Sequence, residues 1–252
     1  MLRRASILAL AALLSTASGA SYAETPAKRA AVSFAAVFDI YLGGLKLAEM
    51  RVDASRQGTD YDAEADLITA GALGVFYTAG FEARAQGSVA AKGWQSASFA
   101  ADSYDSNKRQ SLEMRYGARG PSVLTAKPPF KPKPWQVDPM AQTGTVDPLT
   151  GAVAALSAQP RERLCQRTVE IFDGRRRYRI ELGKPEAAGE AEVLCPAVYE
   201  RIGGFKPKKM KEPTFPFRMW FAPRADGLWE ISRAAGDTPF GTATMVKRTP
   251  PS

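Results

Sequence analysis

FAAVFDIYLGGLKLAEMRVDA, residues 34–54, is the stretch that decides the fold. Apolar side chains recur at every second position on both sides of Gly43-Gly44, and a period of two is typical of a β-strand with one buried face. Glycine adopts the positive φ angles that a two-residue hairpin turn requires. We therefore expect an antiparallel hairpin of Phe34–Leu42 and Leu45–Ala54.

The same alternation continues along the chain, interrupted by Gly, Pro, Asp or Asn. Asp173-Gly174 and Asp226-Gly227 are strong hairpin turns, and a two-residue turn at the first pairs Glu170 with Arg177. It also places an ionic face opposite an apolar one. The further expected strands are Tyr61–Ala70, Gly80–Ala90, Gln95–Tyr104, Gln110–Tyr116, Pro121–Ala126, Arg167–Phe172, Arg175–Leu182, Ala191–Arg201, Thr214–Ala222, Leu228–Ala235 and Phe240–Arg248.

Two segments interrupt the strands. Prolines remove ladder donors from Lys127–Trp135, so this segment is interpreted as a semi-rigid connector, with a recognition segment as the alternative. Asp147-Pro148 then provides an N-cap and a first-turn proline for a helix over Leu149–Ser157. The fold class is therefore all-β: a single domain, residues 33–249, with a strongly curved antiparallel sheet, half-barrel or spiral, and one short helix packed on it.

The N-terminus has the pattern of a secretory signal peptide. Arg3 and Arg4 precede an apolar run over residues 7–14, and Ser21-Tyr22-Ala23 fits a small-x-small cleavage site. Eight apolar residues are too few for a spanning helix, which needs about 20. We expect a cleaved signal peptide, residues 1–23, a disordered stretch, residues 24–32, and a periplasmic protein that is not an integral membrane protein.

Cysteine content and charge agree with export. The chain has two cysteines, and in an oxidising compartment Cys165 and Cys195 most simply form one structural disulfide, with thiol chemistry as the alternative. The formal charge of +8 falls to +6 on cleavage, because the signal peptide carries two arginines and no acid. A basic exported chain suits anionic partners such as lipid headgroups, and nucleic acid is not expected in that compartment.

The composition argues against an enzyme. No histidine occurs in the 252 residues, and histidine is the usual general base and metal ligand near neutral pH. We expect no catalytic residues, cofactor or metal, although a hydrolase that uses two carboxylates is left open. Four alternating acids carry a calcium-site hypothesis, but the wet face of a strand explains them more simply. They are Asp60, Asp62, Glu64 and Asp66.

Two basic clusters are the candidate ligand site. Arginine binds phosphate in a bidentate manner, so such clusters are able to hold an anionic headgroup, while ordinary solvated surface is the alternative. The clusters are Arg175, Arg176, Arg177 and Arg179 at one hairpin, and Lys206, Lys208, Lys209 and Lys211 in one loop. The residues predicted to bind the ligand are Arg175, Arg176, Arg177, Lys208 and Lys209.

Four groups of residues stand out as landmarks: Asp39–Leu45, Val146–Thr150, Cys165 with Val169–Arg176, and Tyr199 with Ile202–Gly204. Together they resemble an uncharacterised family of proteobacterial exported proteins, classed as a domain of unknown function. The resemblance covers Phe34–Lys247 and implies no catalytic or binding residue. More loosely, the chain is similar to envelope-integrity proteins and lipoprotein carriers whose antiparallel sheet winds into a spiral or half-barrel.

These observations predict a non-enzymatic periplasmic envelope protein that binds a lipid or other amphiphile in the concavity of its sheet. One alternative is a structural or protein-interaction module of the envelope, whose partner is another envelope protein. The second alternative is the carboxylate-dependent hydrolase. An open apolar trough favours the first, a packed core with an exposed patch the second, and paired buried acids the third.

Overall fold

A computed structural model describes residues 32–71, 74, 77–91, 93–189 and 191–249. The predicted signal peptide and residues 24–31 lie outside this part. The strands of the described part are β1 (Val32–Leu42), β2 (Leu45–Gln57), β3 (Asp60–Thr69), β4 (Ala79–Ala90), β5 (Gly93–Asp105), β6 (Arg109–Gly117), β7 (Gly120–Lys127), β8 (Arg167–Phe172), β9 (Arg177–Leu182), β10 (Glu186–Ala187), β11 (Val193–Gly203), β12 (Thr214–Pro223), β13 (Trp229–Thr238) and β14 (Gly241–Lys247).

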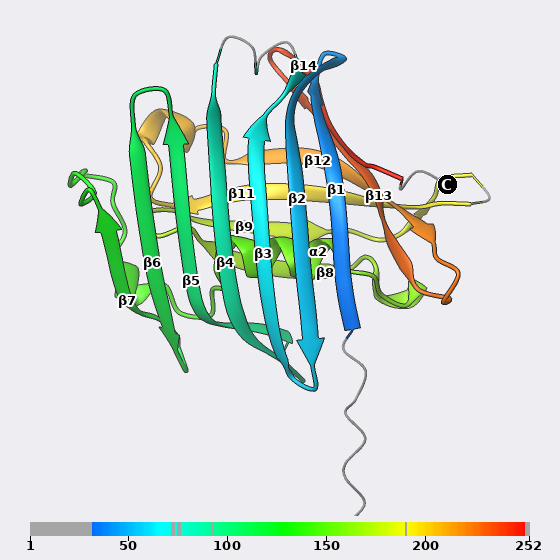
Figure 1. Ribbon diagram of the computed structural model, residues 1–252, viewed down its shortest axis with the longest axis horizontal. Coiled ribbons are helices and arrows are strands. Elements are labelled where there is room, and N and C mark those ends of the chain that lie inside the picture. Colours follow the sequence, from blue (N-terminus) through cyan, green and yellow to red (C-terminus); the bar gives the residue numbers. More distant parts are fainter. Residues whose placement is uncertain (1–31, 72–73, 75–76, 92, 190, 250–252) are drawn as a thin grey trace, which may run out of the picture.

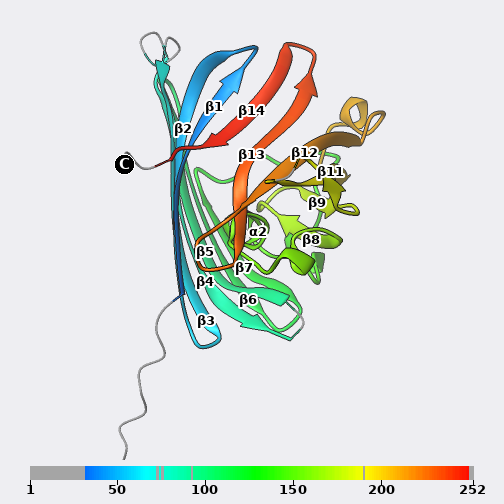
Figure 2. The same cartoon turned by 90° about the vertical axis from the view of Figure 1, so that its right-hand side faces the viewer.

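All these strands join one antiparallel sheet, in the order β7-β6-β5-β4-β3-β2-β1-β14-β13-β12-β11-β9-β8, with β10 beside β11 (Figure 1). The sheet therefore consists of a first meander, β1–β7, and a second meander, β8–β14. They meet where β1 pairs with β14, for example Phe38 with Lys247. The two ends of the order, β7 and β8, are not paired with each other in the described part, so the sheet is open. Figure 2 shows the first meander curving around the second.

One α-helix, α2 (Pro148–Leu156), lies inside the curve (Figure 2). The inner face of β3 and β4 beneath it includes four small buried side chains, Ala63, Ala65, Ala83 and Ala85. Short side chains let a helix approach a sheet closely, and α2 contacts β3, β4, β5 and β8. The described residues also form three short 3₁₀ turns, η1 (Pro139–Ala141), η2 (Arg161–Arg163) and η3 (Pro207–Lys209).

The predicted all-β class, curved antiparallel sheet and single short helix are confirmed. Gly43 and Gly44, with φ of 55° and 86°, form the expected two-residue turn, and Leu42 pairs with Leu45. The expected Lys127–Trp135 connector joins β7 to the segment that leads into α2. The two-residue strand β10 was not predicted, because it is too short to show a period.

The predicted register of the hairpin formed by β8 and β9 is wrong by two residues. Glu170 pairs with Arg179, not Arg177, because four residues rather than two connect β8 to β9. The Asp173 carboxylate accepts hydrogen bonds from the backbone N–H groups of Arg175 (2.9 Å) and Arg176 (2.7 Å), which stabilises the longer turn. A shift of two keeps the faces, so the predicted ionic and apolar sides remain.

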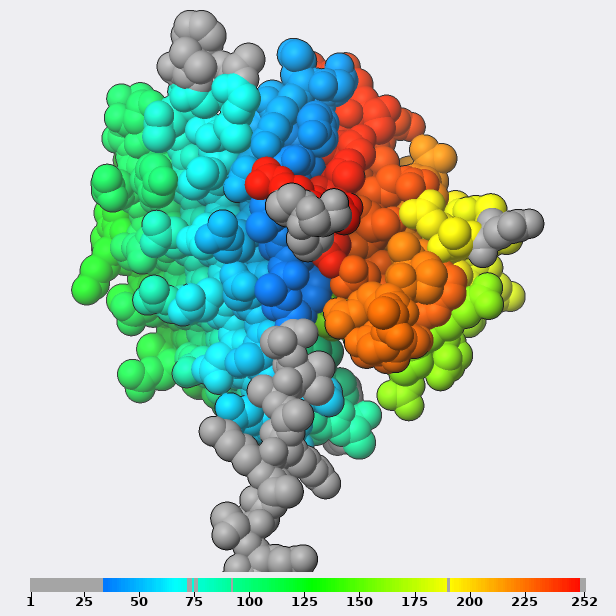
Figure 3. All heavy atoms as spheres, turned by 45° about the vertical axis from the view of Figure 1, so that its right-hand side comes forward, coloured from blue at the N-terminus to red at the C-terminus, as the bar shows by residue number. Residues whose placement is uncertain are grey.

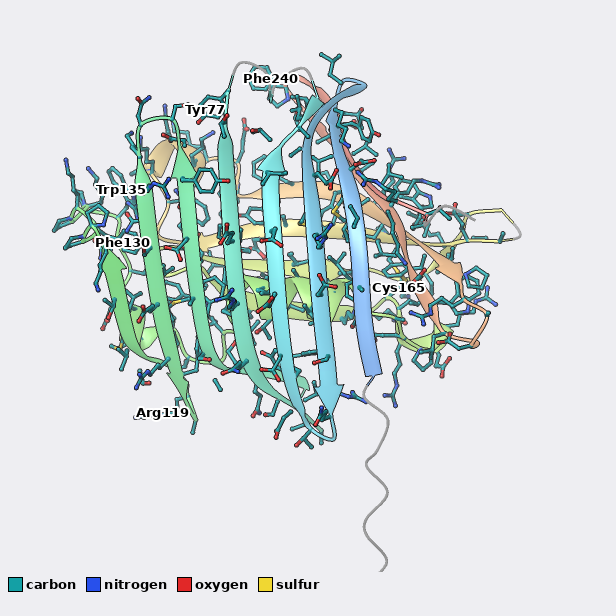
Figure 4. The ribbon with its side chains drawn as sticks, in the orientation of Figure 1. Tyr77, Arg119, Phe130, Trp135, Cys165 and Phe240 are labelled. Atoms are coloured by element: carbon teal, nitrogen blue, oxygen red, sulfur yellow. A yellow bond between two sulfur atoms is a disulfide. The ribbon has the colours of Figure 1, made fainter. Side chains whose placement is uncertain are left out.

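The two cysteines lie together as predicted. Cys165, just before β8, and Cys195 on β11 form a disulfide with a Cα–Cα distance of 5.5 Å (Figure 4 labels Cys165). Both side chains are buried, at 7% and 0% exposed. The disulfide therefore links the residues just before the edge strand β8 to strand β11 of the second meander.

Candidate functional site

A pocket of about 760 Å³ opens at one end of the concave side. It lies between the C-terminal end of α2, the start of β8, the β4–β5 hairpin and the β12–β13 turn. In Figure 3 the surface is hollowed between the orange β12–β13 turn and the teal end of the β4–β5 hairpin. Its apolar wall includes Phe34, Val89, Trp94, Val146 and Val153. The volume is within the range of small-molecule sites, about 300 to 1,000 Å³.

Arg167 on β8 lines this pocket from the inner face of the sheet. Its guanidinium donates to the carbonyl oxygens of Ala154 (2.7 Å) and Ala155 (2.8 Å), at the C-terminal end of α2. Burial lowers its pKa to about 10, so it remains cationic at neutral pH. Its buried Nε has no hydrogen-bond partner, and no described carboxylate forms an ion pair with the group.

The mouth of the pocket carries more positive than negative charge. Arg56 and Arg163 are exposed there and have no ion-pair partner among the described residues. The two lining carboxylates, Glu170 and Asp226, each contact an arginine already, at 3.1 and 3.0 Å. An apolar wall with uncompensated arginines at its rim is complementary to a ligand that has an apolar body and an anionic group.

A buried polar network fixes α2 on the sheet beside this pocket. The carboxylate of Asp147, the N-cap, accepts from the hydroxyls of Ser96 and Thr150, both at 2.5 Å, and from the Thr150 N–H at 2.8 Å. Tyr61 lies 2.5 Å from the Thr150 hydroxyl. The Thr150 hydroxyl donates its single proton to Asp147, so it acts only as an acceptor toward Tyr61. Tyr61 is therefore the donor in that contact. Burial raises the pKa of the Asp147 carboxyl.

Sequence reasoning identified Asp147 as an N-cap but missed this network and Arg167. The position of Arg167 in the strand was the available signal. It precedes Val169 and Ile171 by two and four residues, so its side chain lies on the same apolar face of the strand. Arg56 likewise follows the inward-facing positions of β2, such as Val52. A charged residue in phase with a buried face marks either a strand end or a site.

The predicted ligand residues lie elsewhere. None of Arg175, Arg176, Arg177, Lys208 and Lys209 lines the pocket. Arg177 contacts Glu170 on the outer face of β8 and β9 at 3.1 Å, while the lysines belong to η3. Whether these five residues bind a ligand stays a prediction, and their surroundings are described below.

The four alternating acids face outward on β3, as the wet-face interpretation expects. Their side chains are exposed, whereas the intervening Tyr61, Ala63 and Ala65 are buried. Glu64 pairs with Arg84 on β4 at 3.0 Å. In the described part of the chain, no three Asp, Glu, Cys or His side chains come together in a way that would hold a metal ion.

None of the helices described here combines the length and the apolar character that crossing a membrane requires.

Comparison with known proteins gives a family and a likeness to solved structures. Residues 37–247 match the model of a family described as "Protein of unknown function (DUF3108)". A search of curated proteins finds no match. Among solved structures, the chain is similar to a beta-barrel-like protein of domain of unknown function DUF1849 from Brucella abortus. The two are 13% identical, with a TM-score of 0.44 over 85% of this chain and 95% of that one.

Proposed function

We propose a function for this chain, which belongs to the DUF3108 family of proteins of unknown function, from the pocket beside α2. The protein binds an anionic amphiphile there, with the apolar part against the wall and the acidic group at the arginines. It acts without catalysis, as a periplasmic protein of the cell envelope.

The observation that carries the proposal is Arg167. A guanidinium deprived of water is costly unless it is paired, yet this one has only two carbonyl partners and an unsatisfied Nε. A bound carboxylate, phosphate or sulfate in the pocket would supply the missing charge. Charge-assisted hydrogen bonds of that kind are about twice as strong as neutral ones.

Two further features support the proposed export and the proposed lack of catalysis. The Cys165–Cys195 pair is consistent with an exported protein, because disulfides persist in oxidising compartments. The sequence has no histidine to activate a nucleophile near neutral pH, which favours binding over catalysis.

The test uses a brominated long-chain fatty acid, because bromine quenches tryptophan fluorescence on contact and Trp94 lines the pocket. The acid is expected to quench the wild-type protein saturably, and Trp94→Phe should abolish most of that quenching. The methyl ester of the same acid should bind about 10- to 100-fold more weakly, since it forfeits a hydrogen bond between charged groups. Native mass spectrometry of protein from its own periplasm would then identify the natural ligand.

A matched pair of variants separates the pocket from general charge. Arg56→Ser with Arg163→Ser removes two cations at the mouth, while Arg51→Ser with Arg115→Ser removes two exposed cations outside the pocket. Only the first pair should weaken binding of the acid. Equal affinity for acid and ester, or equal loss in both double variants, would contradict the proposal.

A further inference from the structure

Three loops that are distant in sequence meet on the β7 side of the molecule. The backbone at Gly204, after β11, lies so close to the β8–β9 turn that a Cβ there would stand 2.1 Å from the Arg175 carbonyl oxygen. A Cβ on Gly203 would stand 2.9 Å from the side chain of Val137, which follows the proline-rich connector. The connector, the β8–β9 turn and the loop after β11 therefore form one continuous surface.

Stacked arginines hold these loops together. The guanidinium of Arg175 lies 4.9 Å from the ring centre of Phe130 in the connector. Those of Arg176 and Arg201 each lie 5.6 Å from the ring centre of Phe205. Arg201 also donates to the carbonyl oxygens of Lys209 (2.8 Å) and Glu212 (3.0 Å), which fixes the lysine loop. Such contacts between cations and aromatic faces are attractive.

The joined surface is strongly basic. Its segments, residues 130–138, 173–176 and 201–212, contain nine Lys and Arg but three Asp and Glu. One of the acids, Asp173, turns inward to its own turn and lies 3.8 Å from Arg176. We name the set the basic surface; its exposed members are Lys131, Lys133, Arg176, Lys206, Lys208, Lys209 and Lys211. Figure 4 shows Phe130 and Trp135 at this edge of the molecule.

We infer that the basic surface docks on a bilayer containing anionic phospholipids. Six exposed lysines on two of the loops, with Arg176 on the third, match a diffuse negative surface, and a juxtamembrane basic cluster gains attraction with every residue near it. Half-buried Trp135 beside them belongs to the residue type that favours the membrane interface. This inference goes beyond the proposed pocket ligand, because no residue of the basic surface lines the pocket.

The experiment is flotation of the purified protein with vesicles of phosphatidylglycerol and phosphatidylcholine in equal parts. The test variant carries Lys131→Ser, Lys133→Ser, Lys208→Ser and Lys209→Ser, all exposed positions where folding should be retained. Each lysine near an anionic membrane contributes a substantial attraction, so we expect partitioning to fall on the order of 1,000-fold. Substituting Lys131 and Lys133 alone should give roughly a thirtieth of the wild-type binding, which isolates the connector.

The control variant removes the same number of charges elsewhere, with Arg51→Ser, Lys108→Ser, Arg119→Ser and Lys184→Ser. Figure 4 shows Arg119 at the opposite end of the β6–β7 hairpin from Phe130 and Trp135. The control should bind nearly as well as the wild type, and vesicles of phosphatidylcholine alone should bind neither. No flotation of the wild type at low salt, equal binding to neutral vesicles, or equal loss in the control would each overturn the inference. Because no fatty acid is added, failure here leaves the pocket test intact.

Discussion

Thr150→Val tests the buried network that fixes α2. Valine keeps the shape but removes the hydroxyl that links Tyr61 to Asp147, both of which are nearly inaccessible. Losing a hydrogen bond to a carboxylate costs about 1.5 to 3 kcal/mol, and leaving the Tyr61 hydroxyl unsatisfied costs about 1 to 3 kcal/mol more. We expect the free energy of unfolding to fall by roughly 3 to 5 kcal/mol.

A double-mutant cycle decides whether the network is the cause. Tyr61→Phe alone removes one neutral hydrogen bond and should cost about 1 kcal/mol. In the double variant with Thr150→Val no tyrosine hydroxyl is left unsatisfied, so its loss should be smaller than the sum by about 1 to 2 kcal/mol. Urea unfolding followed by circular dichroism measures all four proteins. Strict additivity would refute the assigned chain of donors from Tyr61 through Thr150 to Asp147.

Joint replacement of Cys165 and Cys195 by Ser should lower the unfolding free energy by about 2 to 5 kcal/mol, measured by the urea midpoint, because the bond closes a loop of 30 residues. Gly204→Ala should destabilise the protein by about 2 kcal/mol or more, since a Cβ there would overlap a carbonyl of the β8–β9 turn. Gly189→Ala, at a similar φ but in open space, should cost only about 1 kcal/mol, and thermal unfolding measures both variants. Burial raises the pKa of Asp147 above its usual value of 3.8, so its contribution to stability is greatest below that pH and is lost as the pH rises. Asp147→Asn should accordingly gain stability relative to the wild type as the pH rises above 3.8 in urea titrations, and the opposite trend would show that the donors around the carboxylate outweigh its burial.

Local patterns explain why most strands were predictable. Alternation with a period of two and glycine turns are properties of neighbouring residues, so hairpins such as β1–β2 follow from the sequence. The pairing of β1 with β14 has no such local signal, because its partners lie at opposite ends of the chain. The β8–β9 register was mispredicted because the Asp173 side chain, not the Asp-Gly dipeptide alone, sets the turn length.

The candidate site was less predictable than the fold. Charge runs drew attention to Arg175 and Lys208, which proved to be on a surface away from the pocket. Arg167 stands alone in sequence, and only its phase with Val169 distinguishes it. The position of the connector beside the β8–β9 turn depends on tertiary contacts that composition does not encode.

The β1–β14 pairing has a consequence for how the protein folds. Nearly every other strand pairs with a neighbour in the chain, but Phe38 and Lys247 close a loop of about 200 residues, whose entropy loss must precede any gain from the contact. Each meander forms mainly by pairing strands that are neighbours in the chain, so we expect the β1–β14 pairing to form last. A circular permutant that links β14 to β1 and opens the chain in the proline-rich connector would turn this slowest step into an ordinary hairpin and speed refolding.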